Sequence, residues 1–439
     1  MKILLVNPNT YRVPPVPPIG IEHVAGAVEE AGHEAEIVDL CFSDSPLGDI
    51  DAAVAAFGPD IAGVSVRNID TVLFQTNEFF LDGIRDIVRH LRERHNLCVI
   101  VGGAGVAVDP GGVVEYLGAD YGVAGPAEGA INELLDDIAR KGVAKRVRYR
   151  SYRYDLRCPR KTEKTDYARY LREGGIGGFD THKGCSSSCV YCIEANTRVS
   201  FKPVDDVLAE LRSLADRGCS SFHLCDSEFN EDLDHAIEFC GALKRRGPSI
   251  DWALYMKPAN YNRKLFRAMK DSGVSLITLT VDSWKKCPLY WSDVEKIVFS
   301  AKSCGLKIMV DFLCGFPYED EETLCFYLDL FRRTQPDGVG INTYIRLYRG
   351  LPITDIIFRD EALKKNLIGY RGDGGLVMPV FYNQLSSERL SELIAGESIF
   401  RIEGLEKGVN YSRRAVPGSA GKTGLPECSA ESAGHGEER

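Results

Sequence analysis

The chain has 439 residues, of which 44% are hydrophobic and 26% are charged, and its net charge at pH 7 is −10. This length and composition indicate a soluble globular chain of about two domains and exclude a wholly disordered or fibrous one. The negative charge opposes attraction to phosphate backbones and no run of about 18 apolar residues occurs, so we expect neither nucleic acid nor a membrane as a partner.

The first 140 residues alternate short apolar, β-branched runs with longer amphipathic stretches. This alternation is typical of βαβ units around a parallel sheet. The expected strands are Lys2–Val6, Ala35–Val38, Ile61–Val66, Leu97–Val101 and Asp120–Val123, and the clearest helices are Gly20–Ala31 and Asn77–Arg94. The pattern predicts an α/β fold that begins with a doubly wound, Rossmann-like domain over residues 1–140, whose ligand crevice lies beyond the carboxyl ends of the strands.

Residues 141–178 carry many Arg, Lys and Tyr with little apolar periodicity and are predicted to be a linker. The alternation then resumes. Expected strands are Phe179–Lys183, Ser221–Cys225, Asp251–Met256, Ser275–Val281, Lys307–Leu313 and Gly338–Ile345, and expected helices are Pro203–Asp216, Asp232–Arg246, Asn262–Ser272, Trp291–Ser303 and Asp320–Thr334. Six βα repeats predict a partial (βα)6 TIM-like barrel over residues 179–350, with its chemistry at the carboxyl ends of the strands.

The remaining residues are predicted to form a small carboxyl-terminal helical extension over 351–407, with one helix at Ser386–Ala395, and a disordered tail over 408–439. The tail is rich in Gly, Ser, Glu and Ala, which bury too little apolar surface to offset the entropy of ordering.

Cysteine usage points to metal or redox chemistry. The opening MKILLVNPN lacks the features of a signal peptide, so we expect a cytoplasmic protein, in which the 14 cysteines are not a disulfide framework. Eleven are scattered and are expected to be small buried hydrophobes. The other three, Cys185, Cys189 and Cys192, lie together in GCSSSCVYC directly after the first expected barrel strand. Structural zinc sites need four closed ligands, whereas three thiolates can hold an iron–sulfur cluster with one iron open. A zinc loop or three unrelated core thiols are the alternatives.

The CxxxCxxC pattern, with Tyr191 before its last cysteine, resembles the radical S-adenosylmethionine (radical SAM) superfamily. The resemblance implies that Cys185, Cys189 and Cys192 bind a 4Fe-4S cluster whose open iron chelates S-adenosylmethionine (SAM), and that one electron then cleaves the SAM to a 5′-deoxyadenosyl radical. It extends from Thr181 to about Pro352.

The resemblance also implies a set of SAM contacts at the strand ends. Besides Tyr191, they are Asp226, Ser227 and Glu228 in LCDSEFN for the methionine amino group, Asp282 and Ser283 in TLTVDS for the ribose or carboxylate, and Gly315 and Pro317 in FLCGFPYEDEET for the adenine. The sequence departs from the family pattern where Asp282 replaces the usual Glu and Tyr318 replaces a glycine. Helix-start acids and ordinary strand-ending turns are the alternative interpretations of these segments.

The first domain resembles the cobalamin-binding domain that precedes the radical domain in one branch of this family, through PPVPPIGIEHVAGAVEEAGHEAEIVDL, VGGAGVAVDP and ADYGVAGPAEGAINELL. Gly-rich loops after strands let backbone approach a large planar ligand, although ordinary turns contain them too. The contacts implied are Asn9, Gly102, Gly103, Gly105, Gly125 and Glu128. No DxHxxG motif follows the first strand, so no histidine is expected below the cobalt, and GPAE stands where the branch has GEGE.

Together these resemblances imply an enzyme that uses a 4Fe-4S cluster, SAM and cobalamin to methylate an unactivated carbon, or phosphorus, of a small molecule such as a natural product. A second hypothesis keeps both cofactors for a rearrangement, cyclisation or oxidation without methylation. A third is a non-catalytic cobalamin and iron–sulfur binding protein. The family also implies a reductant protein such as flavodoxin or ferredoxin as a partner. The sequence does not identify the substrate.

Overall fold

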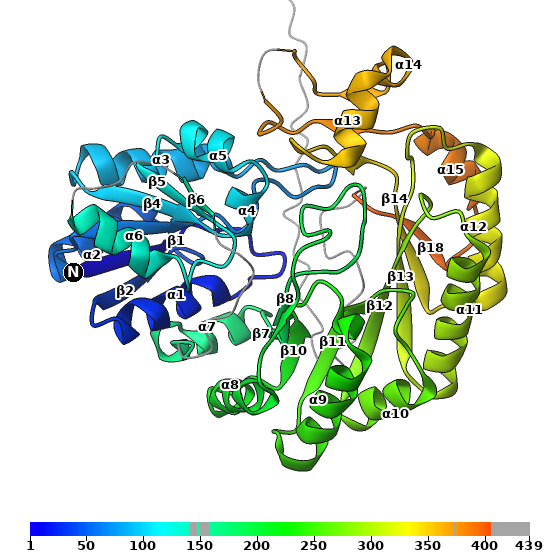
Figure 1. The fold of residues 1–439 in the computed structure, drawn as a ribbon, viewed down its shortest axis with the longest axis horizontal. Helices are drawn as coiled ribbons and strands as arrows, with labels where there is room; N and C mark the ends of the chain where they lie inside the picture. The colour runs from blue at the N-terminus through cyan, green and yellow to red at the C-terminus, as the bar shows by residue number, and fades with distance from the viewer. Residues whose placement is uncertain (141–146, 150–158, 373–374, 405–439) are drawn as a thin grey trace, which may run out of the picture.

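The computed structural model describes residues 1–140, 147–149, 159–372 and 375–404, and these form two α/β bodies that face each other (Figure 1). The first body contains a six-stranded parallel sheet in the order β2-β1-β3-β4-β5-β6. Its strands are β1 (Lys2–Asn7), β2 (Glu34–Asp39), β3 (Ile61–Ser65), β4 (Cys98–Gly102), β5 (Tyr121–Ala124) and β6 (Val147–Tyr149). The strand order reverses between β1 and β3, which is where ligand crevices form in doubly wound sheets.

Helices cover both faces of this sheet, which confirms the predicted doubly wound fold. They are α1 (Ile19–Glu30), α2 (Pro46–Phe57), α3 (Leu81–Glu93), α4 (Ala104–Ala107), α5 (Pro110–Leu117) and α6 (Ile131–Ala139). Buried residues of α1 and α6 share one apolar core with the sheet, and those of α2, α3 and α5 share another. The two cores are separate because successive strand residues point to opposite faces of the sheet.

The second body is an open barrel built on a seven-stranded parallel sheet, ordered β18-β14-β13-β12-β11-β10-β7. Its strands are β7 (Gly177–Phe179), β10 (Ser221–Leu224), β11 (Asp251–Met256), β12 (Val274–Asp282), β13 (Lys307–Leu313), β14 (Gly338–Asn342) and β18 (Phe400–Ile402). The outer helices are α8 (Val204–Asp216), α9 (Leu233–Arg246), α10 (Arg263–Asp271), α11 (Pro288–Ser303) and α12 (Glu321–Thr334). The predicted partial barrel is therefore confirmed, with β18 as an added edge strand.

Smaller elements complete the chain. They are the short helices η1 (Thr162–Lys164), α7 (Tyr167–Arg172) and η2 (Phe229–Glu231), the hairpin strands β8 (His182–Lys183) and β9 (Ser200–Phe201), and an extension of α13 (Pro352–Arg359), α14 (Glu361–Lys364), α15 (Ser387–Leu393), β15 (Ile345–Arg346), β16 (Leu367–Ile368) and β17 (Phe381–Tyr382). The strand β6 lies inside the segment 141–178 that was expected to be a linker, and the expected tail, 408–439, lies outside the described residues. Among the described helices, none has the length and apolarity needed to cross a bilayer.

A buried network of charged side chains, which we call the Arg160 hub, joins the two bodies. The Arg160 guanidinium donates to Glu22 of α1, to Glu210 Oε1 of α8 at 2.5 Å and to the Gly178 carbonyl of β7 at 2.7 Å. Lys202 Nζ bonds the other oxygen of Glu210 at 3.1 Å. Since buried charges are tolerated only when they are paired, these contacts fix α1 against the barrel.

A second buried contact joins the first body to the extension. Arg346 Nε of β15 donates to Asp70 Oδ2 at 2.8 Å, and both side chains are at most 3% exposed. Arg346 also donates to the carbonyls of Leu376 and Val377. Phe74 stacks on Tyr344 close by, with ring centroids 4.3 Å apart. The orientation of the two bodies is thus held at two separate places.

Candidate active site

The three clustered cysteines lie in the long loop of the β8–β9 hairpin. The loop closes on itself because the Cys185 amide donates to Thr197 Oγ1 at 2.9 Å and the Thr197 amide donates to the Cys185 carbonyl at 3.0 Å. Gly184 starts the loop with φ +87°, and a Cβ there would lie 2.3 Å from the Arg198 carbonyl oxygen. A side chain at residue 184 would therefore collide with the returning strand, so glycine is required.

The three thiols are partly or fully buried, and burial raises the pKa of Cys185 and Cys192 to about 11. Burial also raises the pKa of Cys189, whose sulfur lies 3.8 Å from Lys285 Nζ. Thiols with raised pKa values stay protonated at neutral pH and are inert, unless a metal group displaces the protons. The loop is therefore suited to holding a metal group and unsuited to nucleophilic catalysis by a free thiolate.

The spacing of the sulfurs argues against a single ion. Tetrahedral zinc with bonds of about 2.3 Å brings its thiolates to about 3.8 Å from one another. In the described part of the chain, the three cysteine sulfurs do not all lie within 4.8 Å of one another. Their thiols are still close enough that Cys185 and Cys189 influence the pKa of Cys192. Three separated thiolates fit a larger group such as an iron–sulfur cluster.

The polar residues after β10 have different partners. Asp226 accepts from the Thr181 amide at 2.7 Å, from Thr181 Oγ1 at 2.5 Å and from the His182 amide at 3.2 Å, so both of its oxygens are used in fastening β8. Ser227 donates to Glu194 in the cysteine loop. These two predicted SAM contacts therefore have protein partners in this structure.

Glu228 differs from its neighbours because one of its carboxyl oxygens is buried and has no partner among the described residues. Its Oε1 accepts from Thr280 Oγ1 of β12 at 2.7 Å, while Oε2 is buried and has no partner among the described residues. Burial raises the pKa of this carboxyl to about 7. Because an unmet buried acceptor is costly, such an oxygen is a natural place for a ligand donor.

Asp282 lies beside the cysteine loop at the end of β12. Its Oδ2 accepts from Tyr191 Oη at 3.3 Å and lies 3.5 Å from Lys285 Nζ, whereas its buried Oδ1 has no partner in the described part of the chain. Burial raises the pKa of Asp282. The neighbouring Ser283 is fastened to β13, because its amide donates to the Leu313 carbonyl at 3.0 Å. Tyr191 and Asp282, both predicted from the sequence, are thus brought together.

The turn after β13 is built on a glycine and a buried carboxylate. Gly315 has φ +88°, and a Cβ there would lie 2.2 Å from the Thr343 carbonyl oxygen. Glu319 Oε2 accepts from the amides of Gly315 at 2.6 Å and Phe316 at 2.8 Å. Pro317 is buried in the same turn. The turn is therefore held in one conformation by a glycine that no other residue can replace and by a buried acid.

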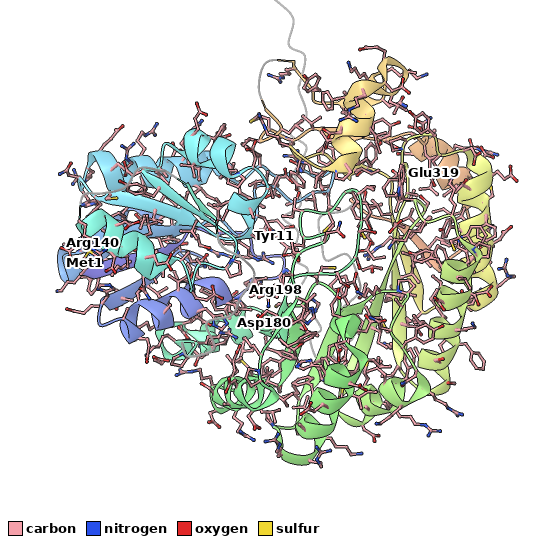
Figure 2. The ribbon with its side chains drawn as sticks, viewed as in Figure 1. Met1, Tyr11, Arg140, Asp180, Arg198 and Glu319 are labelled. Carbon is pink, nitrogen blue, oxygen red and sulfur yellow. The ribbon has the colours of Figure 1, made fainter. Side chains whose placement is uncertain are left out.

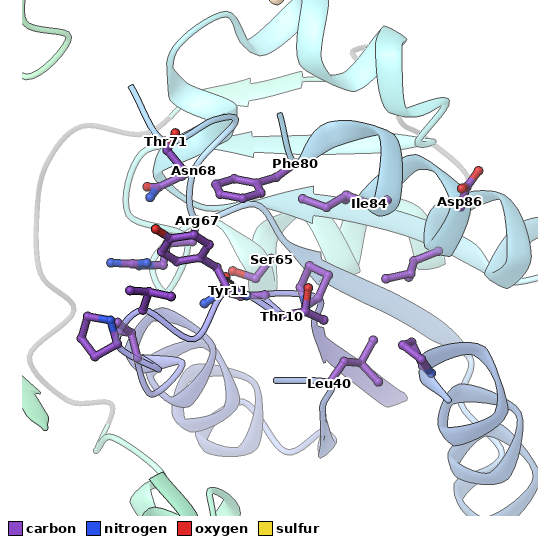
Figure 3. A pocket seen from close by; sticks show the side chains of 18 of the residues that line it. Thr10, Tyr11, Leu40, Ser65, Arg67, Asn68, Thr71, Phe80, Ile84 and Asp86 are labelled. Atoms are coloured by element: carbon purple, nitrogen blue, oxygen red, sulfur yellow. Dashed lines mark hydrogen bonds between the residues drawn. The ribbon is translucent and has the colours of Figure 1, made fainter. Parts of the chain in front are cut away.

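A cavity of about 740 Å³ lies in the first body at the switch point of its sheet (Figure 3). Its walls come from the loops after β1 and β3, from α2 and α3, and from one barrel residue, Tyr255 of β11. The lining includes Asn9, Tyr11, Arg67 and Phe80. A volume in the range of about 300–1,000 Å³ is typical of cofactor sites. Figure 2 shows Tyr11 on the side of the first body that faces the barrel.

Of the residues predicted to contact cobalamin, Asn9 lines this cavity, and the others lie at the ends of β4 and β5. Gly103 has φ +111°, and a Cβ there would lie 2.6 Å from the Val66 carbonyl oxygen. A Cβ on Gly105 would meet the same residue. These glycines therefore allow α4 to pack on the end of β3. Gly102 ends β4, Gly125 has φ +90°, and Glu128 is buried.

The cysteine loop also contacts the first body. Ile193, the residue after Cys192, packs against the apolar core that α2, α3 and α5 share with the sheet. Burial raises the pKa of Tyr348, which also packs on this core, and Cys192 is among the nearby groups that contribute to the rise. The thiol loop is therefore at the junction of the two bodies.

Comparison with known proteins agrees with this geometry. The family model "B12 binding domain" matches residues 10–135, and the family model "Radical SAM superfamily" matches residues 180–331. The chain is a radical SAM protein with a B12-binding domain. This confirms the resemblance drawn from the sequence.

Relatives of this radical SAM chain include a tryptophan 2-C-methyltransferase of Streptomyces laurentii, 25% identical over 80% of this chain and 73% of that protein. A cytidylyl-2-hydroxyethylphosphonate methyltransferase of Streptomyces wedmorensis is 27% identical over 32% of this chain and 29% of that one. The structure of TsrM from Kitasatospora setae, a radical SAM methyltransferase with cobalamin and a [4Fe-4S] cluster bound, superposes with a TM-score of 0.78 at 25% identity, covering 90% of each chain. The structure of OxsB, a cobalamin-dependent radical enzyme, shares the fold, with a TM-score of 0.71.

Sequence reasoning missed several residues of the site. Lys285 contacts both Cys189 and Asp282, Glu194 holds Ser227, Glu319 builds the turn after β13, and Tyr255 reaches the cavity from the barrel. Asp282 and Lys285 are only three residues apart, so their ion pair is local in the sequence. The other contacts join distant segments and leave no local pattern.

Proposed function

We propose that this chain is a cobalamin-dependent radical SAM methyltransferase that acts on a small molecule. One observation carries the proposal: a three-thiol loop on a radical SAM barrel packs directly on the B12-binding domain of the same chain. When bound, the cluster would deliver the electron that activates SAM, and cobalamin would carry the methyl group. The relatives named above, which methylate small molecules, support this reaction class.

Cys185, Cys189 and Cys192 would hold the cluster as thiolates, and Lys285 beside Cys189 would offset part of their negative charge. Glu228 would accept from the amino group of SAM, since its Oε2 has no partner in the part of the chain that the structure describes, while both oxygens of Asp226 have partners. Asp282 and Ser283 would contact the ribose or carboxylate, and the turn at Gly315 and Pro317 would pack against the adenine. These proposed roles use the SAM contacts predicted from the sequence and name Glu228 as the acceptor for the amino group.

Two other features support chemistry shielded from water. Tyr191, Trp284 and Phe316 form an aromatic group beside Asp282, with ring centroids 5.5–5.7 Å apart. Apolar walls lower the local dielectric and exclude water from reactive species. The cavity in the first domain would hold cobalamin, with Asn9 and Arg67 among its polar contacts and Tyr255 contributed by the barrel. We further propose a cytoplasmic location and a flavodoxin or ferredoxin as reductant.

The test is anaerobic reconstitution with iron, sulfide and hydroxocobalamin, followed by reaction with SAM that carries a deuterated methyl group. Tryptophan is the first substrate to try, because TsrM has been solved with tryptophan bound. The proposal predicts a deuterium-labelled product and S-adenosylhomocysteine. Formation of 5′-deoxyadenosine without any labelled product would favour a non-methylating reaction, and absence of SAM turnover under strong reductant would favour a binding protein.

Variants localise the cluster. A Cys185→Ala, Cys189→Ala, Cys192→Ala triple variant should lose the iron-dependent absorption and SAM turnover while it retains cobalamin, because the cavity lies in the other domain. The matched control is Cys287→Ala with Cys304→Ala, which removes two thiols from the ends of α11. Loss of iron in the control but not in the triple variant would refute the assignment.

A further inference from the structure

Two imidazoles and a carboxylate converge in the first domain, and none of the three lines the cavity or belongs to the thiol loop. Asp51 lies on α2, His90 lies on α3, and His95 follows α3. The Nε2 atoms of His90 and His95 lie 2.7 Å and 2.6 Å from the same oxygen, Asp51 Oδ1. The three ligand atoms therefore all lie within 4.8 Å of one another.

We propose that Asp51, His90 and His95 form a binding site for a divalent transition-metal ion. Two imidazole nitrogens and one carboxylate oxygen are the donor set of many three-ligand zinc sites, which keep a fourth position for water. Imidazole nitrogens also favour late first-row ions over Mg²⁺ or Ca²⁺. The proposed sites of the cluster and of cobalamin do not include these three residues.

The present geometry needs only a small adjustment to accept an ion. Metal bonds of about 2.0–2.2 Å at tetrahedral angles place ligand atoms about 3.3–3.6 Å apart, which is roughly 0.6–1.0 Å more than the Nε2 to Oδ1 distances of 2.7 Å and 2.6 Å here. Each imidazole now directs a ring nitrogen at the carboxylate. An ion between them would replace the hydrogens of these bonds and keep the same ring orientations.

The side chains can make this adjustment. The imidazoles are 15% exposed and Asp51 is 37% exposed, so a hydrated ion can reach them, while α2 and α3 fix the backbones of Asp51 and His90. Arg94 approaches the other oxygen of Asp51, Oδ2, at 3.5 Å, and is 66% exposed, so it can swing into solvent when a cation binds.

The site would tie together two helices that also wall the cavity at the switch point. Leu47 of α2 and Ile87 of α3 line that cavity, and each lies about one helical turn before the ligand on its own helix. Two helices that share a bound metal ion are held at a fixed separation. The ion would thus act as a staple for the first domain.

The experiment compares zinc binding by the cluster-loaded, cobalamin-loaded protein with binding by a His90→Gln/His95→Gln variant. Glutamine can still donate hydrogen bonds to Asp51, so the variant keeps the link between the helices, but its amide is a poor zinc ligand. The matched control is His33→Ala, which removes a histidine of the first domain that does not belong to the proposed zinc site. Calorimetric titration with ZnCl2 after EDTA treatment gives the stoichiometry.

We expect wild type and His33→Ala to bind one more zinc ion per chain than the double glutamine variant. Zinc should also raise the thermal midpoint of the first two proteins, because it binds only the folded arrangement, and leave that of the variant unchanged. Equal zinc stoichiometry in wild type and the variant would overturn the proposal. So would wild type and variant showing the same zinc-dependent shift in thermal midpoint.

Discussion

Replacing Asp70 by Asn should open the joint between the first domain and the carboxyl-terminal extension. Asp70 accepts from Arg346 at 2.8 Å in a pair that is at most 3% exposed, and its other oxygen accepts from the Val72 amide at 2.8 Å. An asparagine oxygen can replace the Val72 contact, but its NH2 group would then face the guanidinium of Arg346. The variant leaves a buried cation without its anion.

Removing one partner of a buried ion pair costs about 3–5 kcal/mol. This free energy corresponds to a rise of roughly 10²–10⁴-fold in the population of molecules in which the contact between the first domain and the extension is open. Native-state hydrogen exchange can measure it at the Leu347 amide, which is held by the Val380 carbonyl at 2.9 Å next to Arg346. Exchange at this amide should accelerate by that factor in Asp70→Asn.

The matched control is Glu321→Gln, which breaks a pair with Arg389 at 2.8 Å whose side chains are about half exposed. Exposed pairs contribute about 0–1 kcal/mol, so exchange at Leu347 should change little. If Asp70→Asn accelerates exchange by less than about tenfold, the buried pair does not hold the joint, and the reasoning from burial is wrong.

Two further predictions concern a carboxyl and a glycine. Glu228→Gln should stabilise the cofactor-free protein at pH 8 by up to about 3 kcal/mol and leave its stability unchanged at pH 4. Burial raises the pKa of Glu228 in the folded protein to about 7, so wild type loses the stability of its protonated form as pH rises through that value, whereas glutamine stays neutral. Parallel profiles of thermal midpoint against pH for the two proteins would contradict this. Gly103→Ala should lower the thermal midpoint and the cobalamin content, because its Cβ would lie 2.6 Å from the Val66 carbonyl oxygen. The control Gly111→Ala, whose Cβ would have nothing within 4 Å, should change neither quantity. Equal behaviour of the two variants would refute the steric argument.

The fold was predictable where buried strands are long. The bounds expected for Asp251–Met256 and Lys307–Leu313 are those of β11 and β13, because their alternating burial extends over six or seven residues. β18 and β6 have three residues each, which is too short for a period to be recognised. Their pairing with distant strands, not their own sequence, makes them strands.

The cluster cysteines were predictable because their spacing is a local motif. The orientation of carboxylates was not. Asp226 and Glu228 are two residues apart in LCDSEFN, yet Asp226 holds β8, while Glu228 bonds Thr280 of β12 and keeps one oxygen without a partner among the described residues. Only the positions of Thr181 and Thr280, each far away along the chain, decide between them.

The Arg160 hub has a consequence for how this protein can be recombined with its relatives. Glu22 belongs to the first domain, Arg160 to the connecting segment and Glu210 to the barrel, so a chimera that takes its B12-binding domain from another parent inherits only part of the set. Such a hybrid buries an unmatched charge at the seam even if each half folds well. Successful grafts of this domain should therefore carry the glutamate of α1 and its arginine together, as a single heritable unit.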